Sequence, residues 1–538
     1  MTTPTKQDTE HVPVLIVGAG LSGLSTAMFL GLHGTRSWVV ERHPSTSTAP
    51  KARGQLADVM EALRIAGVAE EMQAAGFDIG KKMEIVIGRT VTGEPLQQLV
   101  EDLNFDLSAV TPAGMAMTSQ ERSEPILAGR ATELGARVQF NTELLSYTVE
   151  ADGVSAVLRD LADGTTRNVT ADYLVAADGW RTRVRGQAGI GTHGHGAVSH
   201  WVNLVIRVDL GELFADREFA LVYLQNPGLH GGSGVFGTTD EPGRYVFAFG
   251  FDPEQQAIED FDRQTCIEQV RIGLGLPDAE VTIEDFAETE FAHRLADRYV
   301  ADRVLLVGDA AHVMPPTGGQ GGNTAVMDGF YLGWKLAMVV KGQAGPGLLQ
   351  SHDSERRPYG EYIADWQYRN LLHRMTPTGA EDHDQEEVEG QDELGSMLGY
   401  RVVDGAVCAE PGDDHEFLEN VFTPTGRPGS RLPHLWLDRG GDQVSVIDLL
   451  GRSFVLLTAA PAWRSAAAEA ADRLGVPITV QVIGDTDLVD PTGRWTQTYG
   501  IGDQGASLIR PDRFVGWRTD EPASAQLLIT ALETVLSR

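Results

Sequence analysis

The chain has 538 residues, too many for one ordinary hydrophobic core, so we expect roughly two to four domains. It carries 43 Lys and Arg residues against 76 Asp and Glu residues, a formal net charge of -33 that is spread along the chain. Nucleic acids and anionic membranes both require a basic protein face, so this charge excludes them as predicted partners.

The cysteine content and the N-terminal residues are used to predict the cellular compartment of the protein. Cys266 and Cys408 are the only cysteines, so the sequence has neither a disulfide framework nor a CxxC redox pair. Residues 1–10 are polar and lack the basic and apolar pattern of a signal peptide, and no apolar run approaches the ~18 residues of a membrane span. We therefore expect a cytoplasmic protein without a membrane segment.

A glycine motif at the N-terminus has the context of a dinucleotide-binding turn. An apolar strand is expected over residues 12–17, a helix over 24–32 and a second strand over 37–40. The glycines of Gly18-Ala19-Gly20-Leu21-Ser22-Gly23 lie between the first strand and the helix, and Glu41 follows the second strand. Such glycines allow a tight turn and a close approach to a diphosphate, and the carboxylate suits ribose hydroxyls.

A second match to the same pattern occurs at residues 189–194. It follows a charged helical stretch and leads into a strand, so it lacks the strand–turn–helix context. We assign it to a linker rather than to a second nucleotide site.

The middle of the chain predicts an inserted β-rich domain. A buried strand over residues 170–177 leads into Asp178-Gly179, and strand-like segments follow at 201–209, 221–225 and 245–251. Glycine and proline turns separate these segments, which is typical of an antiparallel sheet. The sequence therefore predicts a second domain inserted into the first.

The stretch from Gly308 to Asn323 predicts a cradle for a flat, phosphate-bearing cofactor. An apolar run leads into Gly308-Asp309, and two prolines and four glycines then precede Asn323 and a helix-like segment. The aspartate offers an acceptor for hydroxyl groups, the prolines fix the backbone, and the glycines expose N–H groups at a helix N-terminus, which favours negative charge. We expect His312 to be packed or hydrogen-bonded rather than a base. We predict no metal site, because His193, His195 and His200 lack metal-ligand spacing.

The last part of the chain predicts a separate small α/β domain. Residues 376–393 are polar and acidic and are expected to form a loop or a solvated helix. Beyond a loop-like stretch near residue 426, a strand is expected over 453–457, an Ala-rich helix over 462–474 and a strand over 478–483.

These motifs carry a resemblance to a known family. GxGxxG, Asp-Gly and Gly-Asp in this order, with a β-rich insertion between the last two, resemble the class A flavoprotein monooxygenases, aromatic hydroxylases with a para-hydroxybenzoate-hydroxylase-like fold. The resemblance covers roughly residues 12–400. Pro315-Pro316-Thr317-Gly318-Gly319, Tyr499-Gly500-Ile501-Gly502 and residues 506–512 are similar to the bacterial hydroxylases of the anthracycline, angucycline and tetracenomycin group.

The resemblance implies an α/β fold with three parts. A Rossmann-like FAD-binding domain would take residues 1–185, with some substrate-domain strands near 80–115, and then residues 291–400. An inserted β-sheet substrate domain would take 186–290. A linker over 401–425 would lead to a thioredoxin-like α/β domain without CxxC over 426–538, whose role would be packing or dimerisation, so a homodimer is one expected assembly.

The resemblance also assigns a cofactor site and a substrate pocket. Lys51 and Asp58 stand where arginines are usual in the family, so the bidentate pairing of a guanidinium with a substrate carboxylate or the diphosphate is not expected from these positions. Thr182 replaces the usual serine and keeps the hydroxyl. Tyr223 on the inserted sheet and Arg374, in the pair Arg374-Met375, are the predicted catalytic residues of the pocket; an ordinary surface arginine is the alternative for Arg374. The predicted FAD-binding residues are Gly18, Gly20, Gly23, Glu41, Arg42, Gln120, Asp178, Asp309, Pro316, Gly319, Gly321, Gly322 and Asn323.

The chemistry that the resemblance implies is aromatic hydroxylation. NADPH, or as the second choice NADH, would reduce FAD, O2 would form a flavin C4a-hydroperoxide, and a phenolic ring of an aromatic polyketide would attack its distal oxygen. The protein would hold the ring, favour the phenolate and exclude water. The alternatives are Baeyer–Villiger oxygenation or inactivation of an antibiotic on the same fold, and a non-catalytic flavin-binding module.

Overall fold

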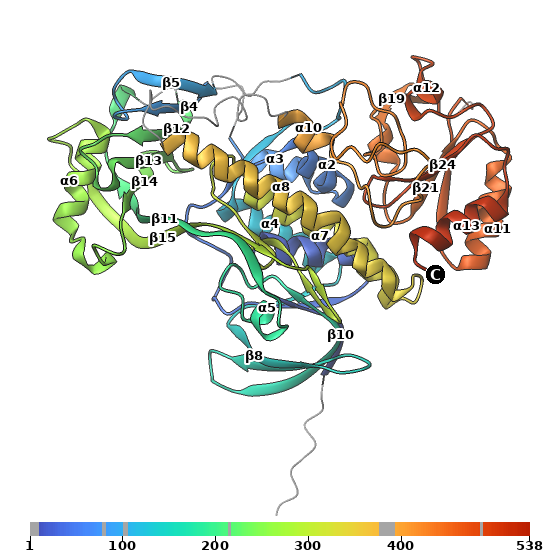
Figure 1. The fold of residues 1–538 in the computed structure, drawn as a ribbon, viewed down its shortest axis with the longest axis horizontal. Coiled ribbons are helices and arrows are strands. Elements are labelled where there is room, and N and C mark those ends of the chain that lie inside the picture. The colour runs from blue at the N-terminus through green and yellow to red at the C-terminus, as the bar shows by residue number, and fades with distance from the viewer. Residues whose placement is uncertain (1–9, 78–81, 101–105, 214–216, 376–392, 485–487) are drawn as a thin grey trace, which may run out of the picture.

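The structure is a computed structural model that describes residues 10–77, 82–100, 106–213, 217–375, 393–484 and 488–538. The predictions for residues 1–9 and for the acidic stretch 376–392 lie outside these ranges. Figure 1 shows a β-rich region on one side, the C-terminal region on the opposite side and long helices between them.

The central sheet has the predicted parallel core. Strand β1 (Glu10–Val17) pairs in parallel with β2 (Ser37–Val40) and with β10 (Thr166–Ala176), and β10 pairs in parallel with β17 (Val304–Leu306). Because β1, β10 and β17 run in one direction, the GxGxxG, Asp-Gly and Gly-Asp motifs that follow them meet at one edge of the sheet. The full order is β16-β17-β10-β1-β2-β7, with the hairpin β8–β9 beside β10; the remaining bounds are β7 (Arg137–Gln139), β8 (Thr142–Val149), β9 (Val154–Asp160) and β16 (Val300–Ala301).

Apolar helices cover the central sheet. Helix α1 (Leu21–Leu32) packs against α7 (Gln320–Val340) and α4 (Gln120–Glu133), and nearly all of α1 is buried. Glycines on α7 permit this close contact, because a Cβ on Gly329 would lie 2.6 Å from the backbone N of Thr26. The smaller elements of this region are β3 (Arg53–Gln55), α2 (Ala57–Ala66), α3 (Ala69–Ala75), β6 (Ala116–Ser119), α5 (Arg183–Gln187) and α10 (Glu393–Leu398).

The inserted domain is an eight-stranded sheet in the order β18-β15-β11-β14-β13-β12-β4-β5. It reaches beyond the predicted limit at residue 290, because β15 continues to Ala296 and β18 follows the Gly-Asp motif directly. Helix α6 (Arg263–Leu274) packs on its outer face. The strands are β4 (Lys82–Gly88), β5 (Pro95–Val100), β11 (Thr192–Arg207), β12 (Arg217–Gln225), β13 (Ser233–Thr238), β14 (Arg244–Phe251), β15 (Thr282–Ala296) and β18 (His312–Val313).

Helix α8 (Gln350–Met375) connects the three regions. Its N-terminal half lies beside α7, and its C-terminal half contacts β15 and β12 of the inserted sheet. Figure 1 shows α8 crossing the front of the molecule between the inserted sheet and the C-terminal region.

The C-terminal region contains a four-stranded sheet in the order β22-β21-β23-β24 and the helices α11, α12 and α13. The chain order of β21, α11, β22, β23, β24 and α13 is the order that a thioredoxin-like domain requires, and residues 401–435 before it are largely irregular. Trp334 of α7 packs into the core of this domain beside Phe454. The bounds are β19 (Trp436–Arg439), β20 (Asp442–Ser445), β21 (Phe454–Thr458), α11 (Trp463–Leu474), β22 (Ile478–Val482), α12 (Trp495–Tyr499), β23 (Ala506–Ile509), β24 (Val515–Thr519) and α13 (Ala525–Val535).

In the described part of the chain no helix is long and apolar enough to cross a membrane. The same residues contain no group of three or more His, Cys, Asp or Glu side chains that could hold a metal ion.

Candidate functional site

The glycines of the first turn bring strand and helix together. Gly18 has φ +109°, and a Cβ on it would lie 2.1 Å from the Ala177 carbonyl oxygen, while a Cβ on Gly23 would lie 1.9 Å from the Gly18 carbonyl oxygen. Gly20 differs, because the nearest atom to its Cβ position is 3.8 Å away on Glu124. Gly18 and Gly23 therefore set the local backbone, and Gly20 leaves room in front of helix α1 for a ligand.

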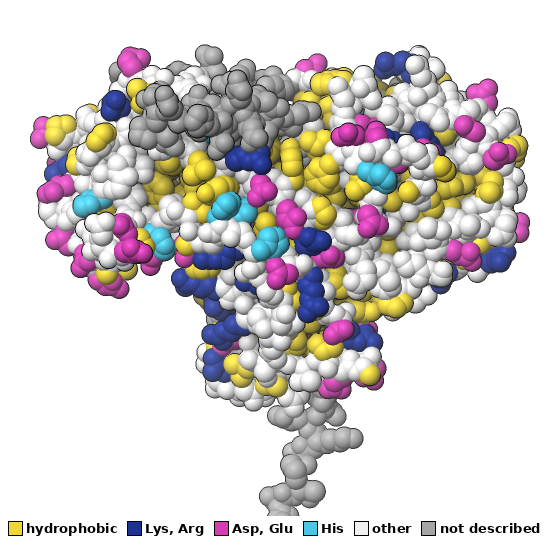
Figure 2. Space-filling model, in the orientation of Figure 1, with side chains coloured by type: hydrophobic (Ala, Val, Ile, Leu, Met, Phe, Trp, Pro, Cys, Tyr) yellow, Lys and Arg dark blue, Asp and Glu magenta, His cyan; other side chains and the backbone are white. Residues whose placement is uncertain are grey.

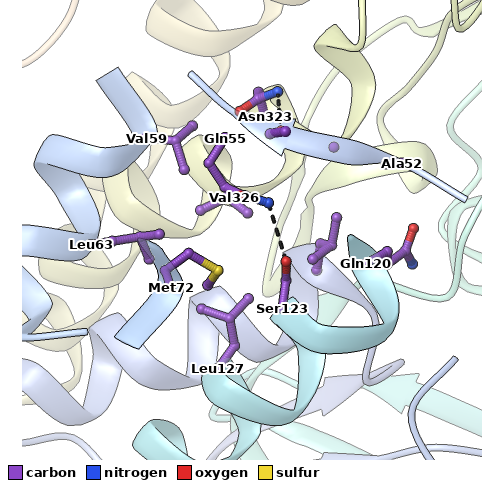
Figure 3. A pocket seen from close by; sticks show the side chains of 13 residues that line it. Ala52, Gln55, Val59, Leu63, Met72, Gln120, Ser123, Leu127, Asn323 and Val326 are labelled. Carbon is purple, nitrogen blue, oxygen red and sulfur yellow. Dashed lines mark hydrogen bonds between the residues drawn. The ribbon is translucent and has the colours of Figure 1, made fainter. Parts of the chain in front are cut away.

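Three helices begin around one recess. Helix α1 begins at Leu21, α4 at Gln120 and α7 at Gln320, and none of the three has a side-chain cap on its N-terminus. Figure 3 shows the recess that lies among them, with Gln120 and Asn323 on its polar side and apolar side chains such as Met72 and Leu127 on the other. Its cavity volume is about 20 Å³, which is room for about one water molecule. Uncapped helix N-termini favour an anion, so the three helix ends suit a diphosphate in front of them rather than inside this mostly apolar recess.

The residues after β2 are already engaged with the glycine turn. Glu41 accepts hydrogen bonds from the backbone N–H of Ala19 and of His43, both at 2.9 Å, and Arg42 is exposed next to it. A carboxylate has further lone pairs, so Glu41 can still accept from a ribose hydroxyl.

Helix α4 contains a polar residue, Glu124, that the sequence prediction missed. Gln120 donates to the carboxylate of Glu124 at 2.6 Å, and Glu124 also accepts from the Ser47 N–H at 2.7 Å. Burial raises the pKa of Glu124, and the Lys51 charge acts in the opposite direction. Lys51 thus supplies a cation at the site where an arginine is usual in the family. The i, i+4 spacing of Gln120 and Glu124 was the available sequence signal.

Asp178 has one oxygen without a protein partner. Its Oδ2 accepts from the backbone N–H groups of Arg183 (2.9 Å) and Val184 (3.3 Å), whereas its Oδ1 is buried and has no hydrogen bond within the described residues. Thr182 caps the same short helix by accepting from the Arg185 N–H at 3.0 Å. The unpaired Oδ1 is free to accept from a ligand in the cleft, which is the region along the edge of the central sheet where the GxGxxG, Asp-Gly and Gly-Asp motifs meet.

Arg185 links the Asp-Gly motif to the Gly-Asp motif, because its guanidinium donates to the Ala310 carbonyl at 2.9 Å. The sequence prediction assigned no role to this arginine. Figure 2 shows further Lys and Arg side chains over the lower lobe that carries α5 and β8, although the chain is strongly acidic overall.

The Gly-Asp turn is held from behind by a buried carboxylate. Asp328 on α7 accepts from the Gly308 N–H at 2.9 Å, from His312 Nε2 at 2.7 Å and from Arg356 Nε at 3.0 Å. Burial works to raise the pKa of Asp328, but the charges of His312 and Arg356 outweigh it and lower that pKa. His312 is therefore a buried, hydrogen-bonded residue, which confirms the prediction. Asp309, the other carboxylate of this turn, is exposed, and desolvation by the surrounding protein raises its pKa while the charge of His312 acts in the opposite direction.

The Pro-Gly turn presents backbone rather than side chains. Pro316 and Gly319 are exposed, and Gly319 has φ +65° just before α7 begins. The Asn323 side chain accepts from the Leu56 N–H at 2.9 Å and donates to the Gly319 carbonyl at 2.8 Å. Asn323 is one of the predicted cofactor-binding residues, and its side chain fixes this turn to the neighbouring segment.

The structure brings the two predicted pocket residues together. The Arg374 guanidinium donates to the Tyr223 hydroxyl at 2.9 Å and lies 5.0 Å from the centre of its ring. The Tyr223 hydroxyl donates to the carbonyl of Thr317 at 3.4 Å. Thr317 is the residue before Gly318 in the Pro-Gly turn. Arg374 is therefore not an isolated surface arginine, and the pair lies beside the Pro-Gly turn.

A second arginine joins the two domains. Arg53 on β3 forms an ion pair of 2.6 Å with Asp240, which follows β13 of the inserted sheet, and Ser119 donates to the same carboxylate at 2.6 Å. Asp58, also unusual for the family, lies elsewhere: it is buried towards the C-terminal domain near Arg513. Asp58 therefore does not take part in the cleft.

Comparisons with known proteins agree with this geometry. A family model described as an FAD binding domain matches residues 11–367, and one described as the C-terminal domain of aromatic-ring hydroxylases matches residues 425–538. The chain is 41% identical to aklavinone 12-hydroxylase of Streptomyces purpurascens, over 98% of this chain and 99% of that protein. It is 38% identical to 4-methyl-5-nitrocatechol 5-monooxygenase of a Burkholderia species, with both chains fully covered.

A solved structure matches the whole chain. It is a ternary complex of aklavinone-11 hydroxylase with FAD and aklavinone, with a TM-score of 0.90 and 40% identity over 99% of this chain and 100% of that chain. The flavin-dependent monooxygenase PieE, solved with FAD and substrate, matches with a TM-score of 0.86 and 29% identity over 98% and 99%.

Proposed function

This chain belongs to the family of FAD-dependent aromatic-ring hydroxylases, and we propose that it hydroxylates a phenolic ring of a polycyclic aromatic polyketide in antibiotic biosynthesis, with NADPH or NADH and O2 as co-substrates. The observation that carries the proposal is the pairing of Arg374 with Tyr223 beside the Thr317 carbonyl. This pairing places a cation and a phenol at the boundary between the inserted sheet and the Pro-Gly turn.

The residues of the cleft fit FAD. Open space in front of Gly20, three uncapped helix N-termini and the unpaired Oδ1 of Asp178 match a diphosphate and a hydroxyl-bearing chain. Glu41 would hold the adenosine ribose, Asp309 the ribityl side, and the backbone from Pro316 to Gly322 the ring system. When bound, FAD supplies the electron transfer from the reduced nicotinamide to O2 and the delivery of one oxygen atom.

The chain's own groups would prepare the substrate ring. Arg374 is positioned to stabilise a phenolate, which is more electron-rich than the phenol. Its bond to Tyr223 fixes the direction of the guanidinium, and Tyr223 is held by Thr317 in turn. Tyr223 is buried and helps to exclude water from this end of the pocket.

A nicotinamide coenzyme is part of the proposal. The exposed Arg181 and Arg183 lie three and five residues after Asp178, and the Arg181 guanidinium lies 4.2 Å from the ring centre of the exposed Trp180. This arrangement supports binding of a phosphate-bearing coenzyme near the Asp-Gly motif. NADPH, which has an additional phosphate, is therefore proposed ahead of NADH.

One relative favours a second candidate function. The 38% identity to 4-methyl-5-nitrocatechol 5-monooxygenase supports a single-ring catechol as the alternative substrate class. Baeyer–Villiger oxygenation would also add one oxygen atom, so product NMR rather than product mass separates it from ring hydroxylation.

The test of the proposed function uses purified protein reconstituted with FAD. We expect a yellow protein whose NADPH oxidation is faster with aklavinone present, and a product that carries one additional hydroxyl. Protein that does not bind FAD would contradict the family chemistry. Oxidation of NADPH with a nitrocatechol but not with aklavinone would favour the second candidate.

A further inference from the structure

The inserted sheet has two faces of different composition. Its outer face carries large apolar side chains, such as Leu204, Phe236 and Phe247, which form one core with α6. Its inner face carries Tyr223, which contacts Arg374 of α8. Figure 1 shows α6 and α8 on opposite sides of this sheet. The inner face is therefore the one that looks towards the cleft.

The strand register places four residues in one row across the inner face. Tyr223 is paired with Val235, Val235 with Ala248, and Ala248 with Asn203. Paired residues on neighbouring strands project to the same face, so the row reads polar, apolar, apolar, polar. Three strand spacings of about 4.8 Å separate its ends, so Tyr223 and Asn203 are about 14 Å apart across the sheet. Short side chains between them leave a flat apolar floor.

The Asn203 side chain carries an oxygen atom without a hydrogen-bond partner within the described residues. This atom, Oδ1, is buried. The side chain is half-buried, although its neighbours along β11, Val202 and Leu204, are completely buried on the outer face. A buried carbonyl oxygen without a partner destabilises the free protein, so a ligand that supplies a donor would bind with an advantage.

We propose that Asn203 determines specificity by accepting a hydrogen bond from a hydroxyl on the far ring of a planar polycyclic substrate, whose reacting ring lies at Tyr223 and Arg374. The inference rests on the proposed function and extends it. Val235 and Ala248 form the floor under the fused rings. A single-ring phenol reaches one end of this row, whereas a fused multi-ring substrate reaches both.

The test compares aklavinone with the single-ring phenol resorcinol on the FAD-loaded enzyme. In Asn203→Leu the polar group is replaced by an apolar one of similar size. We expect the ratio of kcat/KM for aklavinone to that for resorcinol to fall about tenfold, the factor of one neutral hydrogen bond. The dissociation constant of aklavinone, measured by absorbance change without NADPH, should rise by the same factor. The Tm of the ligand-free variant should be equal to or above that of wild type, because an unpaired buried oxygen is removed.

A second variant tests the floor independently. Ala248→Leu adds bulk between the two ends of the row, so it should weaken aklavinone binding by more than tenfold while the variant still binds resorcinol and FAD. If both variants affect the two probes equally, or if Asn203→Leu lowers the Tm and leaves the ratio unchanged, Asn203 has a structural role and the proposal is wrong.

The outcome for the proposed function is separate. Wild-type enzyme that binds aklavinone without hydroxylating it would contradict the proposed function, and the binding series would still decide the role of Asn203. Wild-type enzyme that binds resorcinol and not aklavinone would overturn both.

Discussion

The interface with the C-terminal domain and the ligand cleft both contain buried polar groups, but these groups differ in their pairing. At the interface, the fully buried carboxylate of Glu61 forms ion pairs with both Arg431 and Arg513. In the cleft, Asp178 Oδ1 and Asn203 Oδ1 have no hydrogen-bond partner within the described residues. Buried charges are tolerated when they are paired, whereas unpaired polar atoms are costly. Glu61 therefore joins the domains through paired charges, whereas the two cleft oxygens keep the capacity to accept a hydrogen bond from a ligand.

A second buried cluster at the interface supports this distinction. Glu355 of α8 accepts from Lys335 of α7 at 2.5 Å and from Arg510 of the C-terminal domain at 2.8 Å. Trp334 donates to Asp512 at 2.6 Å in the same cluster. The C-terminal domain thus holds α7 and α8 through paired charges, while the start of α7 and the end of α8 remain open to the cleft.

The largest effect is expected from unpairing the interface. Glu61→Ala leaves two buried guanidinium groups without their carboxylate and removes the acceptor of the Thr111 hydroxyl. Loss of one partner of a buried ion pair costs about 3–5 kcal/mol. We expect a fall of this size in the free energy of unfolding, measured by chemical denaturation. If the free energy of unfolding falls by less than about 1 kcal/mol, the paired charges of the interface do not stabilise the fold and the contrast with the cleft is wrong.

The opposite behaviour is expected in the cleft. Arg374→Met removes the cation beside Tyr223 but no buried ion pair within the described residues, so the free energy of unfolding should change by less than about 0.5 kcal/mol. The kcat/KM for the aromatic substrate should fall about 100-fold, a loss typical of removing one donor that stabilises a developing charge. Arg374→Lys keeps the charge without the planar guanidinium, so its kcat/KM should lie between those of wild type and Arg374→Met. Wild-type turnover in Arg374→Met would refute the role of this cation.

Asp58 lies near Arg513 at the same interface, and its Oδ1 is buried and unpaired within the described residues. Burial raises its pKa from 3.8 to about 6, although Arg513 acts in the opposite direction. Between these values the folded state binds more protons than the unfolded state, so stability falls as the pH rises through this window. Asp58→Asn should therefore be more stable than wild type, by roughly 3 kcal/mol at pH 8 and about half of that at pH 5. Thermal unfolding at the two pH values measures this difference, and a larger gain at pH 5 than at pH 8 would contradict the assignment.

The sequence predicts the cleft where its geometry is local. The turn from Gly18 to Gly23 joins consecutive elements, and the motifs after β1, β10 and β17 must meet once these strands are parallel. The predicted C-terminal limit of the inserted domain, residue 290, is less accurate, because β15 continues to Ala296 and pairs with β18 after the Gly-Asp turn. Nothing in the local composition marks that continuation.

The remaining groups depend on contacts between distant parts of the chain. The row from Tyr223 to Asn203 requires the register of four strands, and the sequence does not specify which residues face each other. Glu61 and Arg513 are separated by 452 positions, so no spacing rule connects them. Tyr223 and Arg374 could be placed together only through the family resemblance, because they are 151 positions apart.

The smallest effect is expected from an exposed ion pair at the same interface. Arg64 lies three residues after Glu61 on α2 and forms an ion pair with Asp448 of the C-terminal domain, with N–O distances of 2.5 and 3.0 Å. Its side chain is 42% exposed, whereas that of Glu61 is fully buried. Because solvent screens exposed pairs, Arg64→Ala should lower the free energy of unfolding by less than about 1 kcal/mol, and added salt should reduce that loss further. A double-mutant cycle with Asp448→Ala isolates the pair from other effects of the truncation. A coupling energy as large as the loss in Glu61→Ala would show that the position of a charge at the interface, rather than its burial, decides its contribution to stability.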